Sequence, residues 1–238
     1  MPSIFFRNLI VSCSLLFVAA LLFSCNSTYT SKKTGYFKID FPQKKYDTFQ
    51  RPGFPFSFEY PVYAKVLQDS TYFDSSPENP YWINIDFPQF NGRIFLSYKI
   101  VGGNAMYKVK QSDGKYKDST GINHFDNMVS DAFNLTNKNQ SVAGSIKDSL
   151  VHTPKGLTGV FFKVGGNAAT PMQFFLSDTS RNFIRGALYF AVTPNIDSMK
   201  PVYDFFEIDI RHLINTFKWT NKEAAGAPRF YFDTASKK

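Results

Sequence analysis

The strongest constraint on the fold is a pair of apolar segments, Met172 to Ser177 and Asn182 to Phe190. The residues between them, 178 to 181, include Asp and Ser, which suit a tight turn, so the pair predicts an antiparallel hairpin. Pairing Ser177 with Asn182 gives two faces, with Phe175, Ile184, Leu188 and Phe190 on one and Phe174, Leu176, Phe183 and Tyr189 on the other. Both faces are apolar, so both must be covered by other parts of the chain.

The first expected cover is an amphipathic helix that begins at Ile122 and is capped by Ser119 or Thr120. Its apolar residues recur with a helical period and share one face, which consists of Ile122, Phe125, Met128, Val129, Ala132 and Phe133. The opposite face is polar, with Asn123, Asp126, Asn127 and Ser130.

The second expected cover is a helix that starts near Asp197 or Ser198, with Pro201 in its first turn. Its apolar stripe consists of Val202, Phe206, Ile210, Leu213, Ile214 and Phe217. Its polar stripe consists of Asp204, Glu207, Arg211, Asn215 and Lys218. Because Arg211 follows Glu207 by one helical turn, an exposed ion pair explains these two charges better than acid–base catalysis does.

A further strand and a further hairpin complete the predicted architecture. Phe56 to Tyr60 alternates with a period of two and stops at Pro61, while Tyr81 to Phe87 and Ile94 to Val101 flank the reversal at residues 88–92. Antiparallel hairpins covered by two amphipathic helices make an α+β fold. The order of hairpin, helix, hairpin and closing helix is similar to that of the Mog1/PsbP-like sandwich.

The N-terminus has the layout of an export signal. Arg7 is the only charge before an apolar run from Leu9 to Phe23, which is shorter than the roughly 20 apolar residues of a membrane-spanning helix. The run ends in Leu-Leu-Phe-Ser before Cys25, a pattern that resembles a lipobox. We therefore expect cleavage before Cys25 and acylation of its thiol, with palmitate among the acyl chains. The alternative is an N-terminal transmembrane anchor with an incidental cysteine; Cys13 has too little apolar length before it.

These features divide the chain into four parts. Residues 1–24 are the signal peptide, 25–34 a lipidated flexible tether, 35–219 a single α+β domain, and 220–238 a polar, mostly disordered tail. Phe230 to Phe232 of the tail could form a short edge strand. Only Cys13 and Cys25 occur in the chain, so the mature protein keeps one cysteine and forms no internal disulfide.

The charge and the aromatic content favour no specific ligand. The net charge of +8 falls to +7 when Arg7 leaves with the signal peptide. A basic protein outside the cytoplasm is attracted to anionic lipid or acidic polysaccharide, and no nucleic-acid partner is expected there. The lysines are spread along the chain, which indicates a solvated surface, and most of the 27 Phe and 13 Tyr are needed for the core.

The sequence predicts no enzyme, no cofactor and no metal site. His124, His152 and His212 lie on separate segments without paired spacing, and G-x-S-x-G, P-loop and G-x-G-x-x-G motifs are absent. The repeated Val-Gly-Gly-Asn-Ala, at 101–105 and 164–168, most simply supplies glycines of positive φ for turns. A duplicated binding loop is the alternative.

Two polar residues interrupt the apolar hairpin, and they are the candidate contacts for a ligand or partner. The register given above places Gln173 and Arg185 on opposite faces, with Arg185 across from Phe174. A cation–π contact or a carboxylate would satisfy the guanidinium, so Arg185 either ties the sheet to a helix or binds a ligand. Asn167 is the third candidate residue.

Several irregular blocks resemble the gliding motility lipoprotein GldD family. They are GNAATPMQFFLSD at 166–178, FIRGALYF at 183–190, PNIDS at 194–198, GYFKIDFP at 35–42 and PQFNG at 88–92. The resemblance runs from Cys25 to about Trp219. It ends at the C-terminal tail and departs near Lys138-Asn139, where the family carries Lys-His, which puts any role of that histidine in doubt here.

The resemblance implies a non-enzymatic envelope lipoprotein that supports gliding motility and the linked type IX secretion machinery by assembling or stabilising partner proteins. The only functional residue that the resemblance implies for this sequence is the lipidated Cys25. The runner-up function is a periplasmic binding module for glycan, peptide or peptidoglycan fragments in a cleft near Asn167, Gln173 or Arg185. Because Asn26-Ser27-Thr28 lacks acidic residues of a surface-export signal, we expect the outer membrane, with the domain facing the periplasm.

Overall fold

The protein is described by a computed structural model, which covers residues 38–68, 81–138, 141, 143–192 and 195–220. The chain divides into two units, Met1–Ile39 and Asp40–Lys238, and every described helix and strand belongs to the second. The expected signal peptide, Cys25, the tether and the possible edge strand at 230–232 lie outside the described residues.

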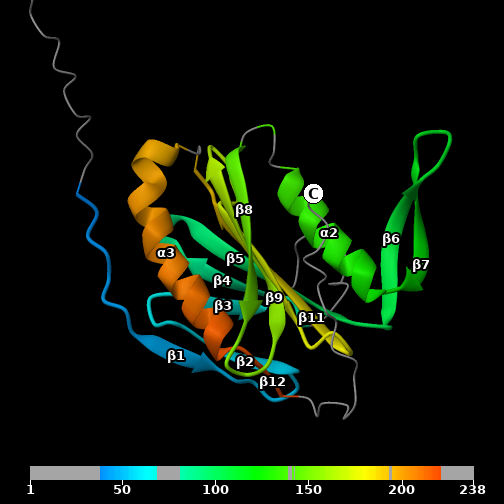
Figure 1. Cartoon of the computed structure of the whole chain (residues 1–238), viewed down its shortest axis with the longest axis horizontal. Coiled ribbons are helices and arrows are strands. Elements are labelled where there is room, and N and C mark those ends of the chain that lie inside the picture. The colour runs from blue at the N-terminus through cyan, green and yellow to red at the C-terminus, as the bar shows by residue number, and fades with distance from the viewer. Residues whose placement is uncertain (1–37, 69–80, 139–140, 142, 193–194, 221–238) are drawn as a thin grey trace, which may run out of the picture. The chain divides into compact units, whose positions relative to one another are not determined.

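A seven-stranded antiparallel sheet forms the centre of the domain, with α3 on one face and α2 on the other (Figure 1). Its strand order is β3 (Lys65–Gln68), β4 (Ile83–Phe87), β5 (Gly92–Ile100), β11 (Asn182–Phe190), β10 (Met172–Ser177), β9 (Thr158–Gly166) and β8 (Ala143–His152). Between β4 and β5 the chain reverses through a short 3₁₀ turn, η1 (Pro88–Phe90), and Asn91 takes a left-handed φ of 47°. The predicted α+β class and hairpins are confirmed.

The register of β10 and β11 differs from the prediction by one residue. Ser177 pairs with Phe183 and not with Asn182, because the turn spans residues 178 to 182. The carboxylate of Asp178 orders this longer turn by accepting the backbone N–H groups of Ser180, Arg181 and Asn182 at 3.2, 2.8 and 2.8 Å. A shift of one residue exchanges the faces of a strand. The face toward α3 therefore consists of Met172, Phe174, Leu176, Ile184, Gly186 and Leu188.

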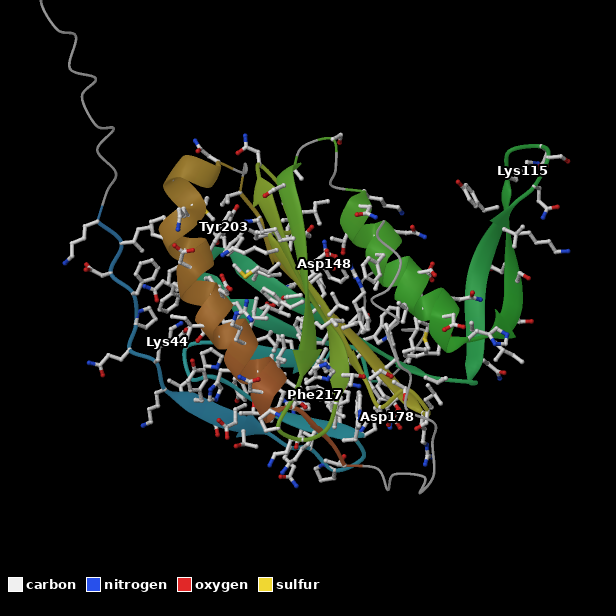
Figure 2. All side chains as sticks on the ribbon, viewed as in Figure 1. Lys44, Lys115, Asp148, Asp178, Tyr203 and Phe217 are labelled. Atoms are coloured by element: carbon white, nitrogen blue, oxygen red, sulfur yellow. The ribbon has the colours of Figure 1, made fainter. Side chains whose placement is uncertain are left out.

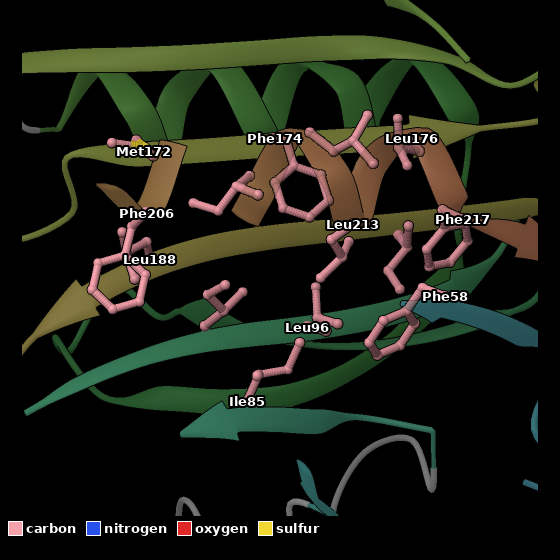
Figure 3. Packing of buried hydrophobic residues seen from close by; sticks show 14 of the residues in the cluster. Phe58, Ile85, Leu96, Met172, Phe174, Leu176, Leu188, Phe206, Leu213 and Phe217 are labelled. Atoms are coloured by element: carbon pink, nitrogen blue, oxygen red, sulfur yellow. The ribbon is translucent and has the colours of Figure 1, made fainter. Parts of the chain in front are cut away.

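Helix α3 (Ile196–Thr216) covers that face with the predicted apolar stripe. All six residues of the stripe are at most 5% exposed, from Val202 to Phe217. Figure 3 shows Phe206, Leu213 and Phe217 against Phe174, Leu188 and Leu96 of the sheet. The helix begins at Ile196, slightly before the expected start, so Pro201 lies beyond its first turn.

A second, three-stranded sheet extends the same core, in the order β1 (Tyr46–Phe49), β2 (Phe56–Pro61) and β12 (Lys218–Trp219). Its aromatic side chains pack at the C-terminal end of α3. The rings of Phe58 and Phe217 are parallel within 2° with centroids 6.0 Å apart, and Phe56 stacks on Phe217 at 5.5 Å. This small sheet therefore packs against the C-terminal end of α3.

Helix α2 (Phe125–Asn137) covers the opposite face of the central sheet. Met128 and Ala132 are buried, and Phe125, Val129 and Phe133 pack beside them against Val160, Phe162, Phe175 and Phe183. The predicted start was wrong: Ile122 ends β7 (Tyr116–Ile122), which pairs with β6 (Asn104–Lys110), and the cap residue is His124. Ser119 and Thr120 lie in β7, where pairing with β6 prevents them from capping the helix.

Gly186 provides a test of the corrected register. A Cβ at this position would lie 2.3 Å from two atoms of the Phe174 ring. We expect Gly186→Ala to lower the free energy of unfolding by about 1–3 kcal/mol, because the ring has to leave its packed position. Urea denaturation measures this change. In contrast, Gly144→Ala on β8 meets its nearest neighbour at 3.8 Å and serves as the control.

Combining Gly186→Ala with Phe174→Leu separates the clash from a general intolerance of alanine at this position. With the ring removed, the added methyl group should cost less than it does in the wild-type background. Equal costs in the two backgrounds would contradict the predicted contact.

Candidate functional site

Arg185, which is partly exposed, and the buried Gln173 form a polar pair on the face of the sheet that α2 covers. Arg185 lies between Phe175 of β10 and Ser97 of β5. Its guanidinium donates a hydrogen bond to Oε1 of Gln173, which is 2% exposed, and Nε2 of Gln173 donates to Oγ1 of Thr170 at 3.2 Å. The expected placement on opposite faces, with Arg185 across from Phe174, is wrong because the register is shifted by one residue.

The charge of Arg185 is not balanced by a neighbouring carboxylate. None of the ion pairs among the described residues includes Arg185. Burial lowers the pKa of the guanidinium, and no nearby charge opposes this shift. Gln173 therefore offers a neutral oxygen to a cation that sits in a largely desolvated position.

A cavity of about 170 Å³ adjoins this guanidinium. It lies between α2 and strands β5 and β11, and its apolar wall consists of Trp82, Met128, Ala132, Leu135 and Phe183. The polar part of the wall consists of Ser97, Lys99, Asp131 and Arg185. The indole N–H of Trp82 donates to the carbonyl of Tyr98 at 3.1 Å, which orients the ring of Trp82.

A wider polar groove of about 660 Å³ lies next to the cavity, toward the base of the β6–β7 hairpin. Lys99, Met128 and Asp131 line both spaces, so the two are continuous. Asn123, His124 and Asn127 add polar groups to the groove. The arrangement is a mostly apolar, partly open cavity with a partly buried cation in its wall, next to a polar groove.

Asn167, the third candidate residue, is an exposed residue of the loop between β9 and β10 and does not line the cavity. It belongs to the second Val-Gly-Gly-Asn-Ala segment. Each copy of that segment contains one glycine of positive φ, Gly102 at 77° and Gly166 at 80°. The turn interpretation of the repeat is thus confirmed.

A second polar cluster, around Asp209 of α3, was not predicted. Asp209 is 2% exposed, and its Oδ2 accepts a hydrogen bond from Nζ of Lys44 at 2.6 Å. The hydroxyl of Tyr46 donates to Oδ1 at 2.9 Å, and the hydroxyl of Tyr63 donates to Oδ2. Lys44, labelled beside α3 in Figure 2, also donates to the carbonyl of Phe205 at 2.9 Å.

The Asp209 cluster is suited to holding the chain in place. Burial lowers the pKa of Lys44, opposed by Asp209, and burial together with Asp209 raises the pKa values of Tyr46 and Tyr63. Both hydroxyls therefore stay protonated as donors at neutral pH. Since both carboxylate oxygens are occupied, Asp209 is poorly placed to act as a base; it fastens the segment around Lys44 to α3.

The position of Asp209 in the sequence indicates that this carboxylate is buried. Asp209 follows Phe206 by three residues and precedes Leu213 by four, so it falls on the apolar stripe of α3. A carboxylate at such a position must find buried partners. The partners are distant in sequence, which is why a local pattern cannot identify them.

Other charged residues of α3 form ion pairs nearer the surface of the domain. Nη2 of Arg211 lies 2.8 Å from Oε1 of Glu207, which confirms the predicted exposed ion pair, and Lys163 of β9 joins the same carboxylate at 2.5 Å. His212 pairs with Glu59 at 2.6 Å and stacks on Tyr46. Among the described residues, no three His, Cys, Asp or Glu side chains are grouped as metal ligands.

Comparison with known proteins identifies the family. The sequence model of the gliding motility lipoprotein GldD matches residues 26–219, which include every described helix and strand. The chain belongs to the GldD family. Comparison of the chain with curated proteins found no match. The GldD match includes both the cavity and the Asp209 cluster, and it begins directly after Cys25.

Among solved structures, this GldD family member is similar to cyanobacterial PsbP (CyanoP) from Synechocystis sp. PCC 6803. The identity is 10% and the TM-score 0.38, with 82% of this chain and 99% of that chain covered. The α+β class rests on the strands and helices themselves. None of the described helices combines the length and apolar character needed to cross a bilayer.

The Asp209 cluster leads to a stability prediction for this GldD family member. Asp209→Ala removes the carboxylate that balances the charge of Lys44 and accepts hydrogen bonds from two tyrosine hydroxyls, so we expect a loss of about 3–5 kcal/mol in the free energy of unfolding. Asp204→Ala, on the exposed side of the same helix, should change it by less than about 0.5 kcal/mol. Chemical denaturation of the two variants makes the comparison.

The double variant Lys44→Met/Asp209→Leu tests how much of the loss comes from the charge of Lys44 left without its carboxylate, since the hydroxyls of Tyr46 and Tyr63 lack Asp209 in both variants. Replacing both charges by apolar side chains should restore a large part of the stability, because no buried charge is left unpaired. A double variant as unstable as Asp209→Ala would contradict this account.

Proposed function

We propose that the protein is a non-enzymatic envelope lipoprotein that supports gliding motility and the linked type IX secretion machinery by assembling or stabilising partner proteins. In this proposal the acylated Cys25 holds the domain at the outer membrane, with the domain facing the periplasm. Membership of the gliding motility lipoprotein GldD family, over residues 26–219, is the observation that carries the proposal.

The surface of the domain adds support for an assembly role. The β6–β7 hairpin extends beyond α2, and Lys115 lies near its tip (Figures 1 and 2). Val109, Tyr116 and Ile122 of this hairpin are 40%, 66% and 55% exposed. A two-stranded ribbon has little core of its own, so apolar side chains exposed on it are suited to contact a partner.

The lipid anchor is tested by Cys25→Ala. We expect this variant to leave the membrane fraction, because a protein without acyl chains and without another anchor has little affinity for the bilayer. Cys13→Ala is the matched control and should fractionate as the wild type does. Protease protection in intact cells then tests the periplasmic side; unchanged membrane partitioning of Cys25→Ala would contradict the anchor.

The assembly role is tested by affinity purification from gentle detergent extracts of the gliding bacterium. Wild-type protein should recover motility or secretion envelope proteins, and Val109→Ser/Tyr116→Ser should recover less of them. Leu150→Ser, which changes a 51% exposed residue on β8, is the control and should behave as wild type. Recovery of no envelope protein by the wild type would contradict the proposal.

A second candidate function is ligand binding, and the cavity beside Arg185 is the observation that favours it. The candidate ligands are glycan, peptide or peptidoglycan fragments. Of the three candidate residues, Arg185 contacts the cavity directly and Gln173 orients Arg185, whereas Asn167 lies elsewhere.

A further inference from the structure

We propose that the cavity between α2 and strands β5 and β11 binds a small organic carboxylate that carries a compact apolar group, with its carboxylate on Arg185. This inference rests on the second candidate function, ligand binding, and is independent of the assembly role. It narrows the ligand to one chemical class.

The positive charge of Arg185 in the cavity wall favours an anionic ligand. The guanidinium of Arg185 has the neutral oxygen of Gln173 as its hydrogen-bond acceptor and forms none of the ion pairs among the described residues. A partly buried cation that has no ion-pair partner is favourably neutralised by an anion, and an arriving carboxylate would supply that charge. Arginine presents parallel N–H donors whose spacing matches the two oxygens of a carboxylate.

The other charges of the wall agree with this selection. Lys99 and Asp131 line the cavity where it joins the polar groove. With Arg185, the wall therefore carries two cations and one carboxylate, which leaves a net charge of +1 for a monoanion to neutralise. Asp131 disfavours ligands with additional negative charges.

The size and the apolar wall define the rest of the ligand. The cavity volume of about 170 Å³ is close to the roughly 150 Å³ of an engineered apolar cavity that holds benzene. Trp82, Met128, Ala132, Leu135 and Phe183 offer no hydrogen-bonding partners at the chamber itself, apart from the already engaged indole N–H. A phenyl ring or a branched alkyl group fits this wall, whereas sugar hydroxyls would lose their hydrogen bonds to water.

The adjoining groove leaves two sources for such a carboxylate. A free acid could enter through the groove, and so could the C-terminal residue of a peptide, whose remaining chain would lie along Asn123, His124 and Asn127. Both sources present the same chemistry to Arg185, so the experiment has to separate them.

The test uses the mature protein and the fluorescence of Trp82, which lines the cavity and is one of only two tryptophans in the chain. The probes are phenylacetate, its neutral isostere phenylacetamide, and short peptides ending in Phe with a free or an amidated C-terminus. We expect saturable binding of a carboxylate, roughly 10- to 100-fold tighter than binding of the matching amide. The tighter of phenylacetate and the free-terminus peptide identifies the source.

Variants of the protein assign the binding to this cavity. Arg185→Gln should weaken binding of the carboxylate toward that of the amide, and Arg211→Gln, which changes an exposed arginine, should leave it unchanged. Leu135→Phe, at a 38% exposed position of the wall, occupies more of the cavity while retaining the guanidinium, adds no indole to the fluorescence signal, and should weaken binding of both probes. This variant keeps the test decisive if Arg185→Gln does not fold.

Equal affinity for acid and amide, unchanged binding in Leu135→Phe, or no saturable response to any carboxylate would each overturn the inference. A neutral glycan that binds when no carboxylate does would overturn the inference and leave the second candidate function in place. The assembly role is measured separately by affinity purification.

Discussion

The two apolar faces of strands β10 and β11 determine how the domain is built, because neither face can be left to water. Helix α3 and the aromatic side chains of the small sheet cover the face that carries Phe174. Helix α2 covers the other face less completely, since the pair of Arg185 and Gln173 interrupts its apolar surface. The cavity lies at this interruption, so the candidate binding site follows from the same requirement that places the helices.

The Asp209 cluster connects this architecture to the N-terminal part of the domain. Lys44 and Tyr46, at the beginning of the folded part, contact a carboxylate near the middle of α3. Tyr63, which follows β2, donates to the same group. Two segments that are separate in sequence thus converge on one buried acceptor of α3, which holds the start of the domain to this helix.

The sequence predicts the individual helices and strands better than it predicts their register and their contacts with one another. Apolar periodicity identifies the hairpins and the buried stripe of α3 because these patterns are local. The predicted register of β10 and β11 is wrong because the carboxylate of Asp178 stabilises a longer turn than expected. This error of one residue placed Gln173 and Arg185 on opposite faces of the hairpin. Ile122 extends the helical period of α2 by coincidence, while pairing with Asn104 holds it in a strand. The partners of Asp209 lie more than 140 positions away and leave no local signal.

The functional account depends on a lipid anchor at the N-terminus, because assembly of envelope partners requires the domain to be held at the membrane. Family membership and the lipobox-like pattern before Cys25 both support that anchor. Intact mass spectrometry of the protein purified from membranes tests it most directly. The account predicts a mature chain that begins at Cys25 and carries more than one acyl chain. A mature chain with an unmodified thiol at Cys25, or one that retains the leader, would contradict it.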